Sequence, residues 1–139
     1  MLSVFFFLST DSFLTSIYSY LVNKALANVD SKSQYDETPI FLASQNRNLL
    51  IVKMLVQDGN ANIKNVKTKW NIETTPLHVA AMKGHFEVVK YLVKKCPKCV
   101  NIKNRFGYTA QSVAGQYCRN TRNTINCMIE KHLKSKTIS

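Results

Sequence analysis

Short stretches of helically spaced apolar residues alternate with polar connections along the middle of the chain. In residues 86–94 the apolar side chains fall three and four positions apart, which is the pattern of an amphipathic helix. The stretch before it, 76–83, predicts a second, thinner helix, with Gly84 forming the turn between the two. Polar connections at 61–74 and 101–108 are predicted to run out and back as hairpins. The pattern therefore predicts an all-α chain of helix pairs joined by hairpin-like loops.

This pattern occurs more than once. Residues 38–43 (TPIFLA) lie 37 positions before residues 75–80 (TPLHVA), and the same offset places 51–56 on 88–93. A third, degraded copy begins 34 positions later at 107–115, without the proline and the histidine. One helix pair of this size is too small to bury its own apolar face. Neighbouring units are therefore predicted to stack into a continuous core.

The period extends into the N-terminal region, since residues 27–30 precede a similar stretch at 61–64 by 34 positions. We therefore interpret residues 13–35 as a partial repeat. Its predicted apolar stripe consists of Phe13, Leu14, Ile17, Tyr18, Leu21 and Val22.

A cleavable signal is the alternative interpretation of the N-terminus, because Ala25-Leu26-Ala27 follows a short apolar run. Asp11 interrupts that run, however, and no basic residue precedes it. A membrane span is also disfavoured, since an aspartate near its centre costs about 2.5–3.5 kcal/mol. Residues 1–12 are left open as a helix, a tail or a processed leader.

The stretch TTPLHVAAMKGHFEVVKYLV, residues 74–93, resembles the signature of the ankyrin repeat family. The matching positions are Thr75-Pro76-Leu77-His78, Ala80-Ala81, Gly84-His85, Val88-Val89 and Leu92. The resemblance implies an all-α ankyrin repeat solenoid of stacked helix-turn-helix units joined by β-hairpin-like loops. The predicted units are an uncertain segment at 1–12, a partial repeat at 13–35, repeats at 36–72 and 73–106, and a degenerate C-terminal capping repeat with a basic tail at 107–139.

A Thr-Pro pair at the head of a repeat predicts the start of a helix. The hydroxyl of Thr38 or Thr75 is expected to bind the first free amides, and the ring of Pro39 or Pro76 presets the first turn. By the resemblance, Thr75 and His78 hydrogen-bond within and between repeats. The resemblance also gives Gly84-His85 the role of the turn between the two helices.

The first full repeat departs from the signature in two places. Phe41 replaces the signature histidine, and Arg47-Asn48 replaces Gly-His. The turn there must be made by residues other than glycine, which carries a conformational cost.

Charge divides the chain into unlike halves. Residues 1–60 carry four basic and five acidic side chains, whereas residues 61–139 carry fifteen basic and three acidic ones. A cationic half attracts acidic proteins, anionic membranes and nucleic acid alike. The lysines are scattered around the repeat, which disfavours a nucleic-acid groove. We therefore predict an acidic protein segment as the partner, with nucleic acid or an anionic membrane as the less favoured alternatives.

The chain shows no nucleophile–base arrangement, phosphate-binding glycine loop or paired carboxylate. We therefore expect no enzyme activity, no cofactor and no small-molecule substrate. His78 and His85 are seven positions apart on different predicted helices, without the ligand spacing of a zinc protease. Structural roles are favoured for both histidines.

Cysteines stand at 96, 99, 118 and 127, and we predict that all four are reduced thiols. The C-x-x-C at 96–99 ends a predicted helix, where the dipole disfavours a thiolate and hence a redox function. Together with Cys118 and Cys127, the C-x-x-C pair would supply the four ligands of a zinc site. Cys118 and Cys127 are nine positions apart, however, unlike the closely spaced second pair of such a site. A plain loop with a proline stop is favoured over metal binding. Reduced thiols predict a cytoplasmic protein, with secretion through an N-terminal signal left open.

By the resemblance, partners bind the concave surface formed by hairpin tips and the exposed edge of the first helices. Trp70 lies in the polar stretch KNVKTKWN and either anchors a partner or packs over the next hairpin near Phe106 or Tyr108. Both alternatives remain open. The predicted contact residues are Lys67, Lys69, Trp70, Met82, Lys83, Lys103, Arg105, Phe106 and Tyr108, beside the hairpin tip at 32–35 and Gln45-Asn46.

The last predicted helix, 121–136, carries Ile125, Met128, Ile129 and Leu133 on one face. A cap that ends the stack is favoured for this helix over a membrane contact. A monomer is expected. The remaining alternative is a purely structural role for the chain as a fragment of a longer ankyrin array.

Overall fold

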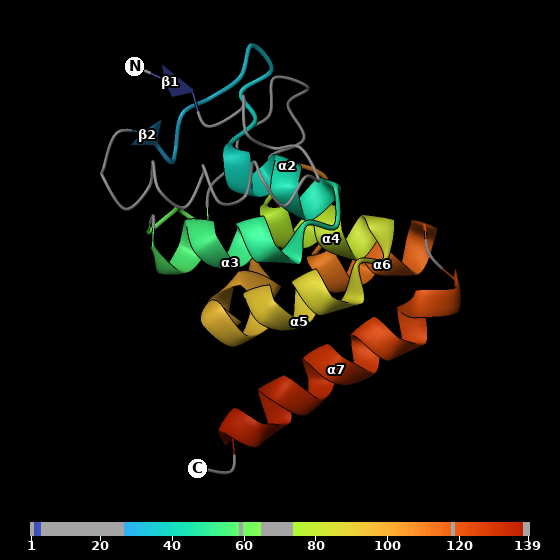
Figure 1. The fold of residues 1–139 in the computed structure, drawn as a ribbon. Helices are drawn as coiled ribbons and strands as arrows, with labels where there is room; N and C mark the ends of the chain where they lie inside the picture. Colours follow the sequence, from blue (N-terminus) through green and yellow to red (C-terminus); the bar gives the residue numbers. More distant parts are fainter. Residues whose placement is uncertain (1, 4–26, 59, 65–73, 118, 138–139) are drawn as a thin grey trace.

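The computed structural model describes residues 2–3, 27–58, 60–64, 74–117 and 119–137, and Figure 1 draws the remainder as a thin grey trace. Three predicted contact residues, Lys67, Lys69 and Trp70, lie outside the described residues. So do the predicted apolar stripe at 13–22 and residues 65–73 of the predicted hairpin at 61–74. These predictions remain predictions.

Helices make up most of the described chain. The exception is a parallel pair of two-residue strands, β1 (Leu2–Ser3) and β2 (Ala27–Asn28), in which Leu2 pairs with Ala27. The predicted all-α fold class is confirmed. In chain order the helices are α2 (Pro39–Gln45), α3 (Leu49–Gln57), α4 (Pro76–Lys83), α5 (Phe86–Lys95), the 3-10 helix η2 (Pro97–Asn101), α6 (Ala110–Tyr117) and α7 (Arg119–Thr137).

The helices form pairs that stack in chain order (Figure 1). The first helices of the pairs, α2, α4 and α6, contact one another in sequence and form one layer. The second helices, α3, α5 and α7, form the other layer in the same order. Each first helix also contacts the second helix that follows it in the chain. This is the stacked helix-turn-helix arrangement that the sequence repeat predicts.

The core lies between the two layers, and its residues recur with the repeat. Fully buried side chains that occupy equivalent positions are Ile40 and Leu77, Ile51 and Val88, and Leu55 and Leu92. Burying one such aliphatic side chain contributes about 1.5–3 kcal/mol. The small residues Ala43, Ala80 and Ala114 are buried in the first-helix layer, where they let the helices approach closely. Each unit therefore adds its stabilisation through the same positions.

The turns between paired helices have the same backbone hydrogen bond although their sequences differ. The amide of His85 donates to the Ala80 carbonyl at 2.9 Å, and that of Asn48 donates to the Ala43 carbonyl at 2.9 Å. Gly84 occupies the left-handed region with a φ of 74°. Its counterpart Arg47 has a φ of 60°. The first turn is thus made without glycine in a conformation that costs other residues roughly 1–2 kcal/mol.

Two described loops between the units are tight turns, at Ser33–Asp36 and at Asn104–Gly107. In both, the amide of the fourth residue donates to the carbonyl of the first, at 3.0 Å and 2.9 Å. The fourth residues, Asp36 and Gly107, have positive φ values of 60° and 81°. The side chain of the first residue accepts two further amide hydrogens, as Asn104 Oδ1 does from Phe106 at 3.0 Å and from Tyr108 at 2.9 Å. These loops are hairpin-like turns fixed by local polar contacts.

The predicted last helix is present as α7. Ile125 and Ile129 are buried against the stack and Met128 is partly buried, whereas Leu133 is exposed. The apolar face is therefore covered over the first part of the helix. Among the described residues, no helix has both the length and the apolar character needed to cross a membrane.

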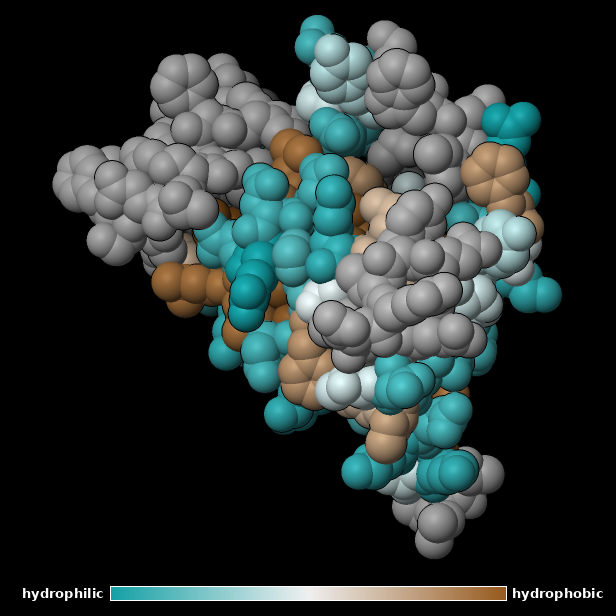
Figure 2. Space-filling view, turned by 90° about the vertical axis from the view of Figure 1, so that its right-hand side faces the viewer, coloured by the Kyte–Doolittle hydropathy of each residue, from teal (hydrophilic) through white to brown (hydrophobic). Residues whose placement is uncertain are grey.

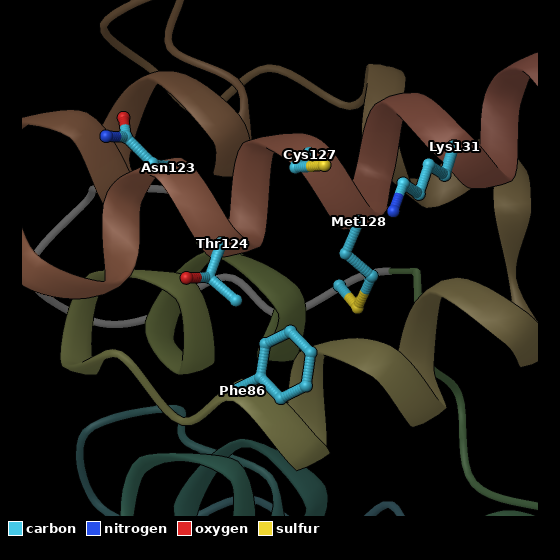
Figure 3. A pocket seen from close by; sticks show the side chains of 6 residues that line it. All are labelled: Phe86, Asn123, Thr124, Cys127, Met128 and Lys131. Carbon is cyan, nitrogen blue, oxygen red and sulfur yellow. The ribbon is translucent and has the colours of Figure 1, made fainter.

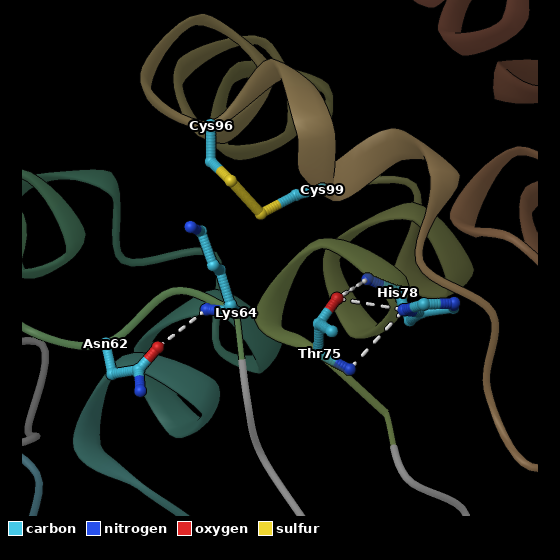
Figure 4. Close-up of a disulfide and its surroundings, with 6 residues drawn as sticks. All are labelled: Asn62, Lys64, Thr75, His78, Cys96 and Cys99. Carbon is cyan, nitrogen blue, oxygen red and sulfur yellow. Dashed lines mark hydrogen bonds between the residues drawn. A yellow bond between two sulfur atoms is a disulfide. The ribbon is translucent and has the colours of Figure 1, made fainter.

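The prediction of four reduced thiols is wrong for Cys96 and Cys99, which form a disulfide (Figure 4). The reason is local. α5 ends before Cys96, Pro97 opens η2, and that turn brings the two α-carbons to 5.4 Å. Cys127 is a free, exposed thiol. Because Cys96 and Cys99 are oxidised, this pair does not indicate a cytoplasmic location.

Candidate protein-binding surface

The head of α4 is closed by a reciprocal set of hydrogen bonds between Thr75 and His78 (Figure 4). The His78 amide donates to Thr75 Oγ1 at 3.4 Å, and the Thr75 amide donates to His78 Nδ1 at 3.4 Å. The hydroxyl lies 2.8 Å from the same nitrogen. Since Nδ1 accepts the amide hydrogen, the ring proton lies on Nε2, which donates to the Tyr108 carbonyl at 3.0 Å. His78 therefore caps its own helix and holds the next hairpin.

Burial controls the charge of this histidine. His78 is fully buried, and desolvation lowers its pKa below the ordinary 6.5, against a smaller raising effect of the Tyr108 hydrogen bond. The neutral ring is required, because protonation would place a hydrogen on Nδ1 facing the Thr75 amide. This arrangement holds loops in place and has no feature of an acid–base catalyst.

The expectation that the Thr38 hydroxyl caps α2 is wrong. Thr38 has nearly the same backbone angles as Thr75, yet its side chain makes no capping hydrogen bond. Its Oγ1 is buried and has no partner among the described residues. The difference is Phe41, which stands where His78 stands in the next repeat and offers no nitrogen to the hydroxyl.

Phe41 instead belongs to a small apolar cluster in the first-helix layer. Phe41 and Val79 are buried, and Leu42 and Met82 pack against them while partly exposed. Met82 was predicted as a contact residue, but Leu42 and Val79 were not. Leu42 and Val79 occupy equivalent positions of the two repeats, 37 apart, and both are apolar. This recurrence outside the main core is the signal that could have identified them.

His85 connects the units in the opposite direction from His78. Its Nε2 donates to the carbonyl of Gln45, the last residue of α2, at 2.9 Å. One unit thus reaches back to the preceding helix end through His85 and forward to the following hairpin through His78.

The predicted contact residues fall into two described groups. Lys103, Arg105, Phe106 and Tyr108 belong to one hairpin, where all four are exposed and Phe106 is 64% exposed. Met82 and Lys83 lie at the C-terminal end of α4. The bond from His78 to the Tyr108 carbonyl attaches this hairpin to the start of the same helix. α4 therefore links the two groups.

Tyr35 extends this pattern to the first hairpin. It occupies the third position of the turn Ser33–Asp36, as Phe106 does in Asn104–Gly107, and is 42% exposed. Both hairpins thus present an aromatic ring at the same point of the turn. Figure 2 shows one face of the molecule, on which hydrophilic side chains cover most of the coloured surface and hydrophobic ones gather in small separate patches.

The sequence matches the family model for the ankyrin repeat at residues 35–69 and 73–105. The chain belongs to the ankyrin repeat family. The two matches include the helix pairs α2–α3 and α4–α5, and α6–α7 follows them in the same stack. A comparison with curated proteins gave no match.

Ankyrin repeats typically serve as protein–protein interaction modules and are usually not catalytic. Within the described part of this ankyrin repeat chain, no three His, Cys, Asp or Glu side chains are grouped so that they could hold a metal ion. Cys96 and Cys99 are bonded to each other. The site residues of interest are therefore those that a protein partner can contact.

Proposed function

We propose that this ankyrin repeat chain is a non-enzymatic interaction module that binds an acidic protein segment on its first helices and hairpin tips. The observation that carries the proposal is the hairpin at 103–108. Phe106, the most exposed of the described large apolar side chains, follows two exposed cationic residues of the same hairpin, Lys103 and Arg105. An exposed aromatic ring beside cations is the composition of an interface anchor.

The hairpin is also rigid, which favours binding. Asn104 is buried, with 9% of its surface exposed, and its side chain holds two amides of the turn. The His78 ring holds the Tyr108 carbonyl. Because the loop is already ordered, it loses little conformational entropy of its own when a partner binds.

Charge supplies the preference for an acidic partner. Lys103 and Arg105 are exposed in the hairpin that carries Phe106, and Lys83 is exposed at the end of α4. We propose that Lys67, Lys69 and Trp70 add to this cationic surface. Such a surface accelerates the encounter with an acidic segment and rejects a basic one.

The test is titration of the chain with acidic peptides, followed by the fluorescence of Trp70, the single tryptophan. We expect Phe106→Ala to weaken the tightest peptide about tenfold, as is usual for an aromatic anchor, and Lys103→Glu to weaken it further at low salt. Leu50→Ala and Lys98→Glu are matched controls, since both residues are exposed and belong to α3 and η2 rather than to this hairpin. Equal effects of the control and test substitutions, or an affinity independent of salt, would contradict the proposal.

A further inference from the structure

A groove runs along the second-helix layer. It begins as a hollow of about 510 Å³ between α5 and α7. In Figure 3 the Phe86 ring rises from α5 toward α7, and the Met128 side chain points down toward that ring. The side chains that line this hollow are Phe86, Asn123, Thr124, Cys127, Met128 and Lys131.

This first hollow continues into two further hollows, one after the other, through shared lining residues. A second hollow of about 380 Å³ shares Met128 and Lys131 with the first and extends to Val93. A third of about 160 Å³ shares Lys90 and Lys94 with the second and crosses α5 to α3. Along α5 the lining residues span positions 86–94, or roughly 12 Å at the helical rise. That length accommodates about two turns of another helix.

The groove has an apolar floor and a cationic rim. Phe86, Val93 and Met128 form apolar parts of the lining, and methionine adapts readily to the shape of a ligand. Among the described residues that line the three hollows, Glu87 is the one acidic side chain. The basic ones are the four exposed lysines Lys53, Lys90, Lys94 and Lys131, together with His132.

We propose that this groove docks an acidic amphipathic helix of a protein partner. The apolar floor fits side chains spaced three and four positions apart, and the four rim lysines complement carboxylates on either side of that stripe. A hollow between two helices receives a protruding ridge, whereas a bilayer surface requires apolar groups that protrude from the protein. The groove therefore favours a peptide helix over a membrane.

The groove is separate from the hairpin surface proposed above. It is formed by α3, α5 and α7, whereas the hairpin surface is formed by the first helices and the turn at Asn104–Gly107. The two docking surfaces can be occupied independently, and each can fail without the other.

Cys127 provides the readout, because this free thiol is exposed and lines the first hollow, between α5 and α7. The probe is a synthetic 14-residue helix with leucine at positions i, i+3, i+4 and i+7 and glutamate on both flanks. The rate of Cys127 alkylation by iodoacetamide is measured by mass spectrometry of its peptide. We expect saturating probe to slow alkylation at least fivefold, and Lys90→Glu with Lys94→Glu to weaken the probe about tenfold through like-charge contacts.

The matched control is the pair Lys83→Glu and Lys103→Glu, which reverses two charges on the hairpin surface and is expected to leave the protection of Cys127 unchanged. A probe with lysine in place of glutamate should not protect. Absence of protection at millimolar acidic probe would overturn the proposal. So would protection that the control pair removes, or protection by vesicles of phosphatidylserine and phosphatidylcholine without protection by the peptide.

Discussion

At the heads of α2 and α4 the backbone angles agree but the hydrogen bonds do not, because residue 41 is phenylalanine and residue 78 is histidine. The Thr75 hydroxyl oxygen accepts a hydrogen bond from the His78 amide and lies beside Nδ1 of the His78 ring. Thr38 keeps a buried hydroxyl with no partner in the described part of the chain. The same residue type therefore stabilises one helix and carries an unmet hydrogen-bonding requirement in the other.

Replacing each threonine with valine should separate these two situations. We expect Thr75→Val to lower the free energy of unfolding by about 1–2 kcal/mol through loss of the cap. Thr38→Val should leave it unchanged or raise it by up to about 1 kcal/mol, because no hydrogen bond is lost and an unpaired buried hydroxyl is removed. Urea unfolding measures both, and each variant is the control for the other. Similar losses in the two variants would show that Thr38 is a cap after all.

Titration of His78 predicts a loss of stability in mild acid. Its pKa is lowered in the folded chain and returns to about 6.5 on unfolding, so below that pH the unfolded state binds more protons. The stabilisation is complete above pH 6.5 and decreases as the pH falls toward the folded pKa. Thermal unfolding from pH 7.5 to 5.0 measures the effect. His78→Asn, which does not titrate, should show a shallower decrease, and an unchanged slope would assign the effect to other groups.

At the scale of elements, the α2–α3 and α4–α5 turns each contain one residue in the left-handed region, which is Arg47 in the first turn and Gly84 in the second. We expect Arg47→Gly to raise the free energy of unfolding by about 0.5–1 kcal/mol, since relief of the positive φ exceeds the entropy cost of glycine. Gly84→Ala makes the opposite change and should cost roughly 1–2 kcal/mol. Urea unfolding of both variants is the measurement, and destabilisation by Arg47→Gly would indicate that the arginine side chain stabilises the turn.

At the scale of the whole molecule, the sequence predicted the helix pairs and their stacking, because core positions such as Ile40 and Leu77 recur at a fixed spacing. It did not predict the Cys96–Cys99 disulfide, which depends on the one-turn η2 helix placing the two residues together. It also missed the groove formed by α3, α5 and α7. That groove is defined by the separation of packed helices, and no short motif encodes such a separation.

The candidate hairpin surface was predictable in part. Phe106 and Tyr108 stand out as aromatic residues in a polar loop, and the structure exposes both. The apolar cluster of Phe41, Leu42, Val79 and Met82 was harder to predict, since its members come from two repeats and meet only when α2 and α4 stack.

The opposite directions of His78 and His85 have a consequence for cooperativity. In a stack where each unit contacts only its neighbours, the outer two of the three described helix pairs are coupled through the pair between them. Here that middle unit holds the preceding helix end with one imidazole and the following hairpin with the other. Opening α4 and α5 would release both flanks at once, whereas an outer pair can fray and leave the middle intact. Unfolding of the middle helix pair therefore unfolds the whole described stack, whereas unfolding of an outer pair stays local.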